Sequence, residues 1–208
     1  MGRVRVHQHV NPLAPYFRRS PKPIIVESVF SDSAKPIFLD LGCARGRFLL
    51  QMAEAEPGWN YLGIEIREAL VAEANRLAAE ARLTNLHYVV CNAMLWLDHL
   101  LGALPDGLLQ MATIQFPDPW FKKKHAKRRM VNGEMIDAIA RRLAPGGSVF
   151  VQTDIEFLAD EMFDLFRASG EFKETPMDAN PFPVQTERER AVEDKGLAVF
   201  RGLFRKKE

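Results

Sequence analysis

Short apolar runs alternate with helical apolar stripes along most of the chain. The run at 37–41 is followed by a glycine turn and then by Phe48, Leu49, Met52 and Ala53 at helical spacing. The later predicted elements are a strand at 61–65, a helix at 67–82, strands at 86–91 and 111–116, a helix at 132–143, a strand at 148–153, a helix that includes 158–166, and closing strands at 172–175 and 197–204. This alternation predicts an α/β fold with a parallel sheet and helices on both faces.

The chain length is that of a single domain. A protein of 208 residues can bury roughly 70% of its unfolded surface. Hydrophobic residues make up 47% of the chain, yet no apolar run approaches the ~20 residues of a membrane span. The first residues include arginines but no apolar segment typical of a secretory signal. We therefore expect a cytoplasmic protein whose single domain covers 34–208.

Residues 1–33 differ in composition from the rest of the chain. Prolines stand at positions 12, 15, 21 and 23, and the stretch from Met1 to Lys22 has five basic residues and no acidic one. The segment lacks sustained apolar periodicity, so we expect a basic arm that is mobile unless bound. It could contact a phosphate backbone or could simply be a frayed terminus.

Polar side chains stand where four of the predicted strands end. These residues are Asp40, Glu65, Asn92 and Asp118. Any one of them could be a solvated loop residue, but ligands of parallel α/β sheets bind beyond the carboxyl ends of the strands, and four together predict one pocket. Glu65 could accept hydrogen bonds from a ribose diol, and Asn92 could contact a base edge or cap its turn.

The first of these ends leads into a glycine turn, Gly42-Cys43-Ala44-Arg45-Gly46. Glycines allow a sharp turn and close approach of a ligand to the backbone. A nicotinamide-type G-x-G-x-x-G motif is disfavoured, because its third glycine would fall on Arg47.

The most unusual stretch runs from Phe116 to Arg129. Asp118 stands between Pro117 and Pro119, which predicts a stiff turn with Phe116 and Asp118 biased toward extended conformations. Six of the eight residues at 122–129 are Lys or Arg. Such a density of like charge favours contact with a polyanion such as RNA over a solvated loop. We expect the turn to carry the chemistry and the basic run to bind RNA.

Two further segments have the spacing of a capping box, in which a Ser or Thr is followed by Glu three positions later. They are 153–156 and 186–189. In the first, Asp154 could serve either the pocket or the start of a helix. The second is predicted to be a helix cap.

Metal and covalent chemistry find no support in the sequence. The five histidines form no i, i+4 pair, and the two cysteines fit neither a zinc spacing nor a disulfide framework. We expect no metal site, reduced cysteines and no covalent catalysis.

Taken together, these motifs resemble those of the bacterial tRNA (guanine-N7)-methyltransferases. The matching motifs are Asp40-x-Gly42-x-x-x-Gly46, Gly63-Ile64-Glu65, Asn92-Ala93, Phe116 to Trp120 with its basic run, Thr153-Asp154 and Thr186-x-x-Glu189. The resemblance begins near residue 37, and its most specific motif is the proline-flanked Asp118. Two residues depart from the pattern: Ala44 replaces a glycine, and Phe121 stands where proline is common.

The resemblance implies a class I methyltransferase, with a Rossmann-like, mostly parallel seven-stranded sheet whose last strand is antiparallel. The reaction would transfer a methyl group from S-adenosylmethionine to a guanine in the variable loop of tRNA. Asp118 would be the catalytic carboxylate. The implied cofactor-binding residues are Asp40, Gly42, Gly46, Glu65, Asn92, Ala93 and Asp118. The implied guanosine contacts are Lys122, Asp154, Thr186, Glu187, Arg188 and Glu189, and the RNA-backbone contacts are Lys123, Lys124, Lys127, Arg128 and Arg129.

Two alternative functions remain open at this point. One is an RNA-binding protein that has this fold but no catalytic activity. The other is a class I methyltransferase with a different substrate.

Overall fold

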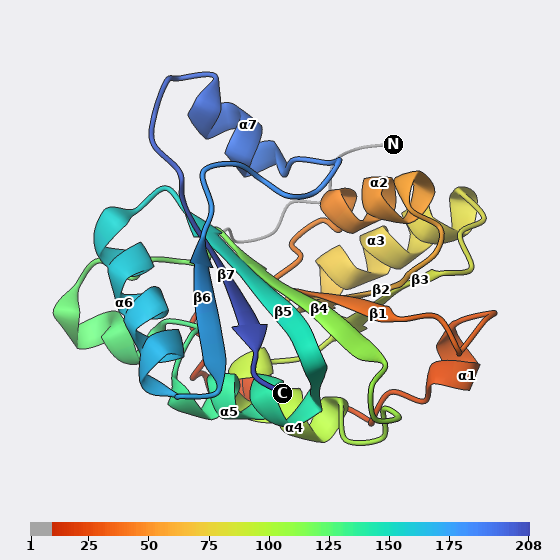
Figure 1. Ribbon diagram of the computed structural model, residues 1–208. Helices are drawn as coiled ribbons and strands as arrows, with labels where there is room; N and C mark the ends of the chain where they lie inside the picture. Colours follow the sequence, from red (N-terminus) through yellow and green to blue (C-terminus); the bar gives the residue numbers. More distant parts are fainter. Residues whose placement is uncertain (1–9) are drawn as a thin grey trace.

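The computed structural model describes residues 10–208, and a seven-stranded sheet runs through this part of the chain (Figure 1). Its strands are β1 (Ile37–Leu41), β2 (Asn60–Glu65), β3 (Leu86–Val90), β4 (Leu109–Gln115), β5 (Leu143–Thr153), β6 (Phe172–Pro176) and β7 (Phe200–Lys206). The strand order is β3-β2-β1-β4-β5-β7-β6. β7 is antiparallel to both of its neighbours, whereas the other pairs are parallel. The predicted α/β sheet is confirmed, including its antiparallel last strand.

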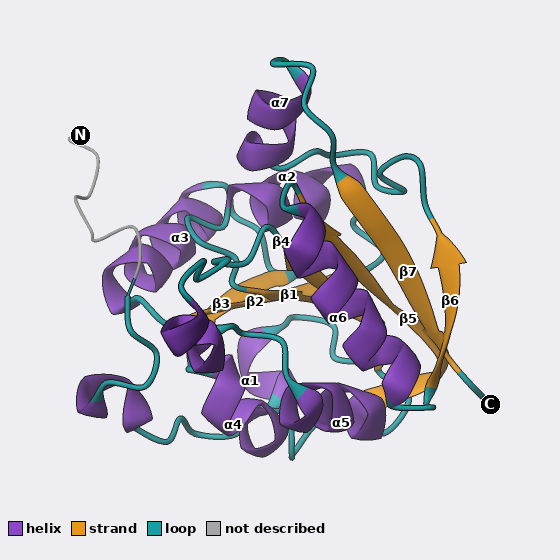
Figure 2. Ribbon diagram, turned by 90° about the vertical axis from the view of Figure 1, so that its left-hand side faces the viewer, coloured by secondary structure: helices purple, strands orange, loops and turns teal. Residues whose placement is uncertain are grey.

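Helices cover both faces of the sheet (Figures 1 and 2). They are η1 (Pro15–Arg18), α1 (Val26–Val29), α2 (Arg47–Ala55), α3 (Glu68–Glu80), α4 (Ala93–Leu100), η2 (Lys123–Arg128), α5 (Gly133–Arg142), α6 (Glu156–Ala168) and α7 (Glu187–Glu193). α2 and α3 pack on one face, and α4, α5 and α6 pack on the other. No helix in residues 10–208 is long and apolar enough to cross a membrane.

The segment before β1 packs against the domain from at least residue 24 onward. Ile24, Val26 and Phe30 are buried in the same core as α4 and α5, and the Ile24 amide donates to the Leu100 carbonyl over 2.9 Å. Apolar contacts therefore order a part of the chain for which the sequence predicted a mobile arm. The boundary at residue 33 stays a prediction, and residues 1–9 of that arm lie outside the described residues.

Close packing around Tyr88 fixes the glycine turn on the sheet. The buried Tyr88 ring on β3 lies against Gly63 on β2, and its hydroxyl donates to the Gly46 carbonyl over 2.5 Å. A Cβ atom on Gly63 would lie 2.4 Å from Cδ1 of Tyr88 and 2.9 Å from Sγ of Cys43. Any side chain at position 63 would therefore displace both the ring and the turn.

We predict that Gly63→Ala lowers the free energy of unfolding by about 1–3 kcal/mol, the usual cost of overpacking a core. Urea unfolding would measure it. Gly58→Ala is the matched control, since a Cβ there meets no atom within 4 Å. Equal stability of the two variants would contradict the packing described for Tyr88.

Candidate active site

The carboxyl ends of the parallel strands line a cavity of about 860 Å³. Such ends meet at one edge of a sheet, which is why residues far apart in sequence gather there. Of the predicted site residues, those that line the cavity are Asp40, Gly42, Glu65, Asn92, Ala93, Asp118, Arg128, Asp154, Thr186, Glu187 and Arg188. Those outside its lining are Gly46, Lys122, Lys123, Lys124, Lys127, Arg129 and Glu189.

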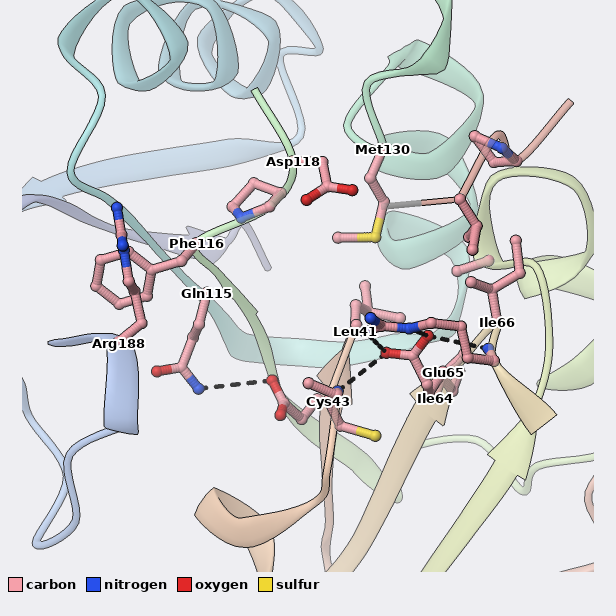
Figure 3. Close-up of a pocket in the computed structure, with 18 of the residues that line it drawn as sticks. Leu41, Cys43, Ile64, Glu65, Ile66, Gln115, Phe116, Asp118, Met130 and Arg188 are labelled. Carbon is pink, nitrogen blue, oxygen red and sulfur yellow. Dashed lines mark hydrogen bonds and ion pairs between the residues drawn. The ribbon is translucent and has the colours of Figure 1, made fainter. Parts of the chain in front are cut away.

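Asp40 is a buried carboxylate at the base of this cavity. It accepts hydrogen bonds from Thr113 Oγ1 at 2.7 Å and from Gln115 Nε2 at 3.5 Å, the second of which is drawn in Figure 3. Burial raises the pKa of Asp40 from 3.8 to about 6, although the two hydrogen bonds work in the opposite direction. A cationic group bound nearby would offset this cost of burying the charge.

Among the described residues, four N–H groups hold Glu65 in place. The Arg67 amide and Nε donate to Oε1 at 3.0 and 2.9 Å, while an Arg67 terminal nitrogen and the Ala44 amide donate to Oε2 at 2.9 and 3.1 Å. Burial works to lower the pKa of Arg67, but the hydrogen bonds and charge of Glu65, helped by the charge of Asp118, outweigh it and raise that pKa. A ribose diol at Glu65 would have to share these oxygens with Arg67, a residue that sequence reasoning missed.

The turn at 42–46 places backbone groups beside the cavity. Ala44 has φ +49°, a left-handed conformation that favours glycine. The amides of Gly42 and Cys43 both donate to the Ile64 carbonyl, at 2.8 and 3.0 Å. The alanine is thus accommodated with some backbone strain, while Gly46 lies behind the turn against Tyr88.

Asn92 is in contact with the N-terminal segment. Its side-chain amide donates to the carbonyls of Pro12, at 2.8 Å, and Phe17, at 3.2 Å. Val10 and Pro12 also line the cavity. The segment preceding the sheet therefore forms part of the cavity wall, which no local pattern in the sequence had indicated.

The loop that carries Asp118 is strained at both ends. Phe116 has φ +51° and Trp120 has φ +43°. The sequence expectation of an extended Phe116 is therefore wrong, because the Phe116 amide pairs with the Gln152 carbonyl at 2.8 Å and the chain turns there. Figure 3 shows Asp118 and Met130 on the side of the cavity opposite Glu65.

Two residues of the basic run stabilise this loop. Arg129 Nε donates to the Pro119 carbonyl at 2.9 Å, and the same guanidinium pairs with Glu161. The guanidinium of Arg128 lies 4.9 Å from the centroid of the Trp120 ring. Arg129 is therefore engaged inside the protein, and Arg128 lines the cavity where Lys122 had been expected.

The lysines of the run have a different position. Lys122, Lys123, Lys124 and Lys127 are all exposed on or beside η2. They form a cationic surface next to the cavity.

The start of α7 lines another side of the cavity. Thr186 and Glu189 form the predicted capping box, and Glu189 is fully buried, where it also binds Arg201 at 2.9 Å. Arg188 pairs with Asp154, and Glu187 pairs with Arg47. These two ion pairs join the start of α7 to the end of β5 and to α2.

The other capping box that the sequence allowed, at 153–156, does not form. The N-cap of α6 is Ile155, which makes no side-chain cap bond, and the Ile155 amide donates a hydrogen bond to Thr153 Oγ1 at 3.3 Å. Asp154 lines the cavity, where it pairs with Arg188.

No group of three or more His, Cys, Asp or Glu in the described part of the chain could hold a metal ion. Cys43 and Cys91 are both free and buried.

Comparison with known proteins identifies the family of this site. The family model "putative methyltransferase" matches residues 34–202. A tRNA (guanine-N(7)-)-methyltransferase of Nostoc sp. is 53% identical over 205 residues, which cover 97% of this chain and 94% of that protein. The protein of the same name from Synechococcus elongatus is 53% identical over 207 residues, which cover 98% of this chain and 97% of that protein. The chain belongs to the tRNA (guanine-N(7)-)-methyltransferase family.

Solved structures extend the likeness of this methyltransferase fold to distant proteins. An rRNA methylase from Streptococcus thermophilus superposes with a TM-score of 0.53 over 88% of this chain and 92% of its own, at 13% identity. Geranyl diphosphate C-methyltransferase from Streptomyces coelicolor was solved with S-adenosyl-L-homocysteine. It superposes with a TM-score of 0.54 over 88% of this chain and 76% of its own, at 15% identity. At these identities the likeness shows the fold alone.

We predict that the raised pKa of Asp40 makes stability pH-dependent. A folded-state pKa above the unfolded value contributes stability that is present below pH 3.8 and is lost as pH rises through about 6. Lowering the pH from about 7.5 to about 5 should therefore stabilise the wild type relative to Asp40→Asn by about 1–1.5 kcal/mol. Urea unfolding of both proteins at the two pH values measures this change, and groups common to both cancel. A constant difference would contradict the buried carboxylate.

Proposed function

We propose that this chain transfers a methyl group from S-adenosylmethionine to N7 of a guanine in the variable loop of tRNA. One observation carries the proposal: the proline-flanked Asp118 enters a cavity lined by Asp40, Glu65 and Asn92, with exposed lysines beside it. The 53% identity to proteins named for this reaction supports it. We propose a cytoplasmic location for the same reason, with 34–208 as the methyltransferase domain.

The residues of the cavity fit S-adenosylmethionine. Its volume of about 860 Å³ lies within the usual range of cofactor sites. In this proposal Asp40 and the turn that begins at Gly42 hold the methionine end of the cofactor, while Gly46 supports this turn from behind. The ammonium charge offsets the cost of burying the Asp40 carboxylate. Glu65 contacts the ribose, and Asn92 and Ala93 contact the adenine.

The protein needs to supply little acid–base chemistry. When bound, S-adenosylmethionine supplies a methyl group on a sulfonium sulfur, and its transfer to the N7 lone pair breaks the carbon–sulfur bond and returns the electron pair to sulfur. Guanine N7 is unprotonated at neutral pH, so no base has to remove a proton. Correct placement of two reactants can contribute about 7–11 kcal/mol, more than general-base help would add.

Asp118 is the residue that we assign to this placement. Its carboxylate accepts hydrogen bonds from the N–H donors of guanine and favours the positive charge that develops on the purine. The stiff loop supports this role, because Arg129 holds the carbonyls of Pro119 and Trp120 and so fixes the turn that bears Asp118.

Contacts to the guanosine are assigned to the surrounding segments. Asp154, Thr186, Glu187 and Arg188 reach the cavity directly. Glu189 acts from behind them, because its buried carboxylate caps α7. Lys122 would approach from outside the cavity.

The decisive experiment incubates unmodified tRNA transcript, labelled S-adenosylmethionine and the protein, and maps the label by cleavage specific for N7-methylguanine. We expect label at one guanine of the variable loop. Asp118→Asn should retain tRNA affinity and lose most of the turnover, since it keeps the shape but removes the charge. Label on another base, or on no RNA, would overturn the proposal, and full turnover by the variant would remove Asp118 from its role.

We also predict that RNA binding is strongly salt-dependent. Each lysine that contacts a phosphate adds about 1 to the slope of log affinity against log salt concentration. Lys123→Ala combined with Lys124→Ala should therefore reduce the magnitude of that slope by about 2. The control is Lys173→Ala on the outer strand β6, which is also exposed and should leave the slope unchanged. An unchanged slope in the double variant would exclude the lysines as phosphate contacts.

A further inference from the structure

Two aromatic rings lie exposed beside the cavity. Phe121 is 67% exposed and Phe157, on the first turn of α6, is 41% exposed. Their centroids are 5.9 Å apart in an edge-to-face arrangement. Phe121 also lines the cavity, directly after the loop of Asp118. A face of the Phe121 ring is thus left to solvent at the entrance.

The pair is held in place from behind. The guanidinium of Arg129 lies 5.1 Å from the centroid of Phe157, and Arg129 is itself fixed by the Pro119 carbonyl and by Glu161 on α6. These contacts tie the loop of Phe121 to the helix of Phe157. The two rings, which we call the platform, are thus linked to the framework of the protein through Phe157.

The charge around the platform indicates what it binds. Lys122, Lys123, Lys124 and Lys127 follow Phe121 in sequence and are exposed. A cationic surface with an exposed ring is the combination that binds single-stranded nucleic acid, since lysines bind phosphates while the ring stacks on a base. An aromatic surface meant for an apolar protein partner would gain nothing from four exposed lysine charges at its rim.

We propose that Phe121, backed by Phe157, stacks on the base of a nucleotide adjacent to the target guanine. The inference rests on the proposed function, because it takes the RNA in the cavity to be the methylation substrate. Phe121 takes no part in methyl transfer. It selects an unstacked, single-stranded context for the guanine, so that a guanine inside a continuous helix would lack this contact.

The test uses unmodified tRNA transcript with Phe121→Ala, Phe121→Leu and Phe121→Trp. A base stacked on a ring contributes an affinity that alanine substitution reduces about five-fold to one-hundred-fold. We expect Phe121→Ala to show this loss both in kcat/KM and in tRNA affinity. Phe121→Leu should show the same loss, because leucine keeps the apolar volume but has no aromatic face. Trp should restore both. Ile25→Ala, which removes a side chain that is 50% exposed on the surface beside α1, is the control.

Two further measurements separate stacking from other roles. The affinity for S-adenosylmethionine should be the same in all variants, and a 2-aminopurine placed next to the target guanine should be quenched by the wild type and by Trp but not by Leu. If wild-type methylation is normal and Phe121→Leu matches it, the stacking is overturned while the function stands. Equal loss of cofactor affinity would likewise overturn it, and absence of methylation by the wild type would reject the proposed function instead.

Discussion

A chain of buried and partly buried hydrogen bonds across the carboxyl edge of the sheet holds the site together. Gln115 Nε2 donates to Asp40 at 3.5 Å, and Gln152 Nε2 donates to Gln115 at 2.8 Å and to Glu189 at 3.2 Å. Arg201 completes it with bonds to Gln152 and Glu189 at 3.2 and 2.9 Å. Because a buried polar group left without a partner is costly, each member fixes the next. The network thus joins β1, β4, β5, β7 and α7, and α7 is held against the cavity.

Periodic and local features were predictable from the sequence, and long-range contacts were not. The strand ends at Asp40 and Glu65 follow from apolar runs that stop at a polar residue, and the cap at 186–189 depends on neighbours in sequence. The helix α4 was missed because apolar residues at most of its positions leave no stripe. Asn92 contacts the carbonyls of Pro12 and Phe17, which lie 80 and 75 residues away in the sequence, and no local rule encodes such a distance.

The basic run illustrates how composition and geometry differ. The sequence predicted that Lys122 contacts the guanosine and that the basic residues from Lys123 onward all contact the RNA backbone. In the structure Arg129 is turned inward onto the backbone of the Asp118 loop and Arg128 onto Trp120, whereas the lysines point to solvent. The division follows the chemistry of the side chains. A planar guanidinium can bond several carbonyls and stack on an indole, while an ammonium is better hydrated and is stabilised by solvent.

Strain and unfavourable burial are concentrated at the cavity. Ala44, Phe116 and Trp120 adopt left-handed conformations that cost of order 1 kcal/mol or more each, and Asp40 is a carboxylate buried with a raised pKa. All four residues line the same cavity, while the core beneath them is closely packed and apolar. A site whose main task is placement needs groups fixed before the reactants arrive, and a rigid surrounding structure is what keeps such strained positions from relaxing. The left-handed Phe116 and Trp120 are thus the means by which a loop with two prolines aims Asp118 at the cavity.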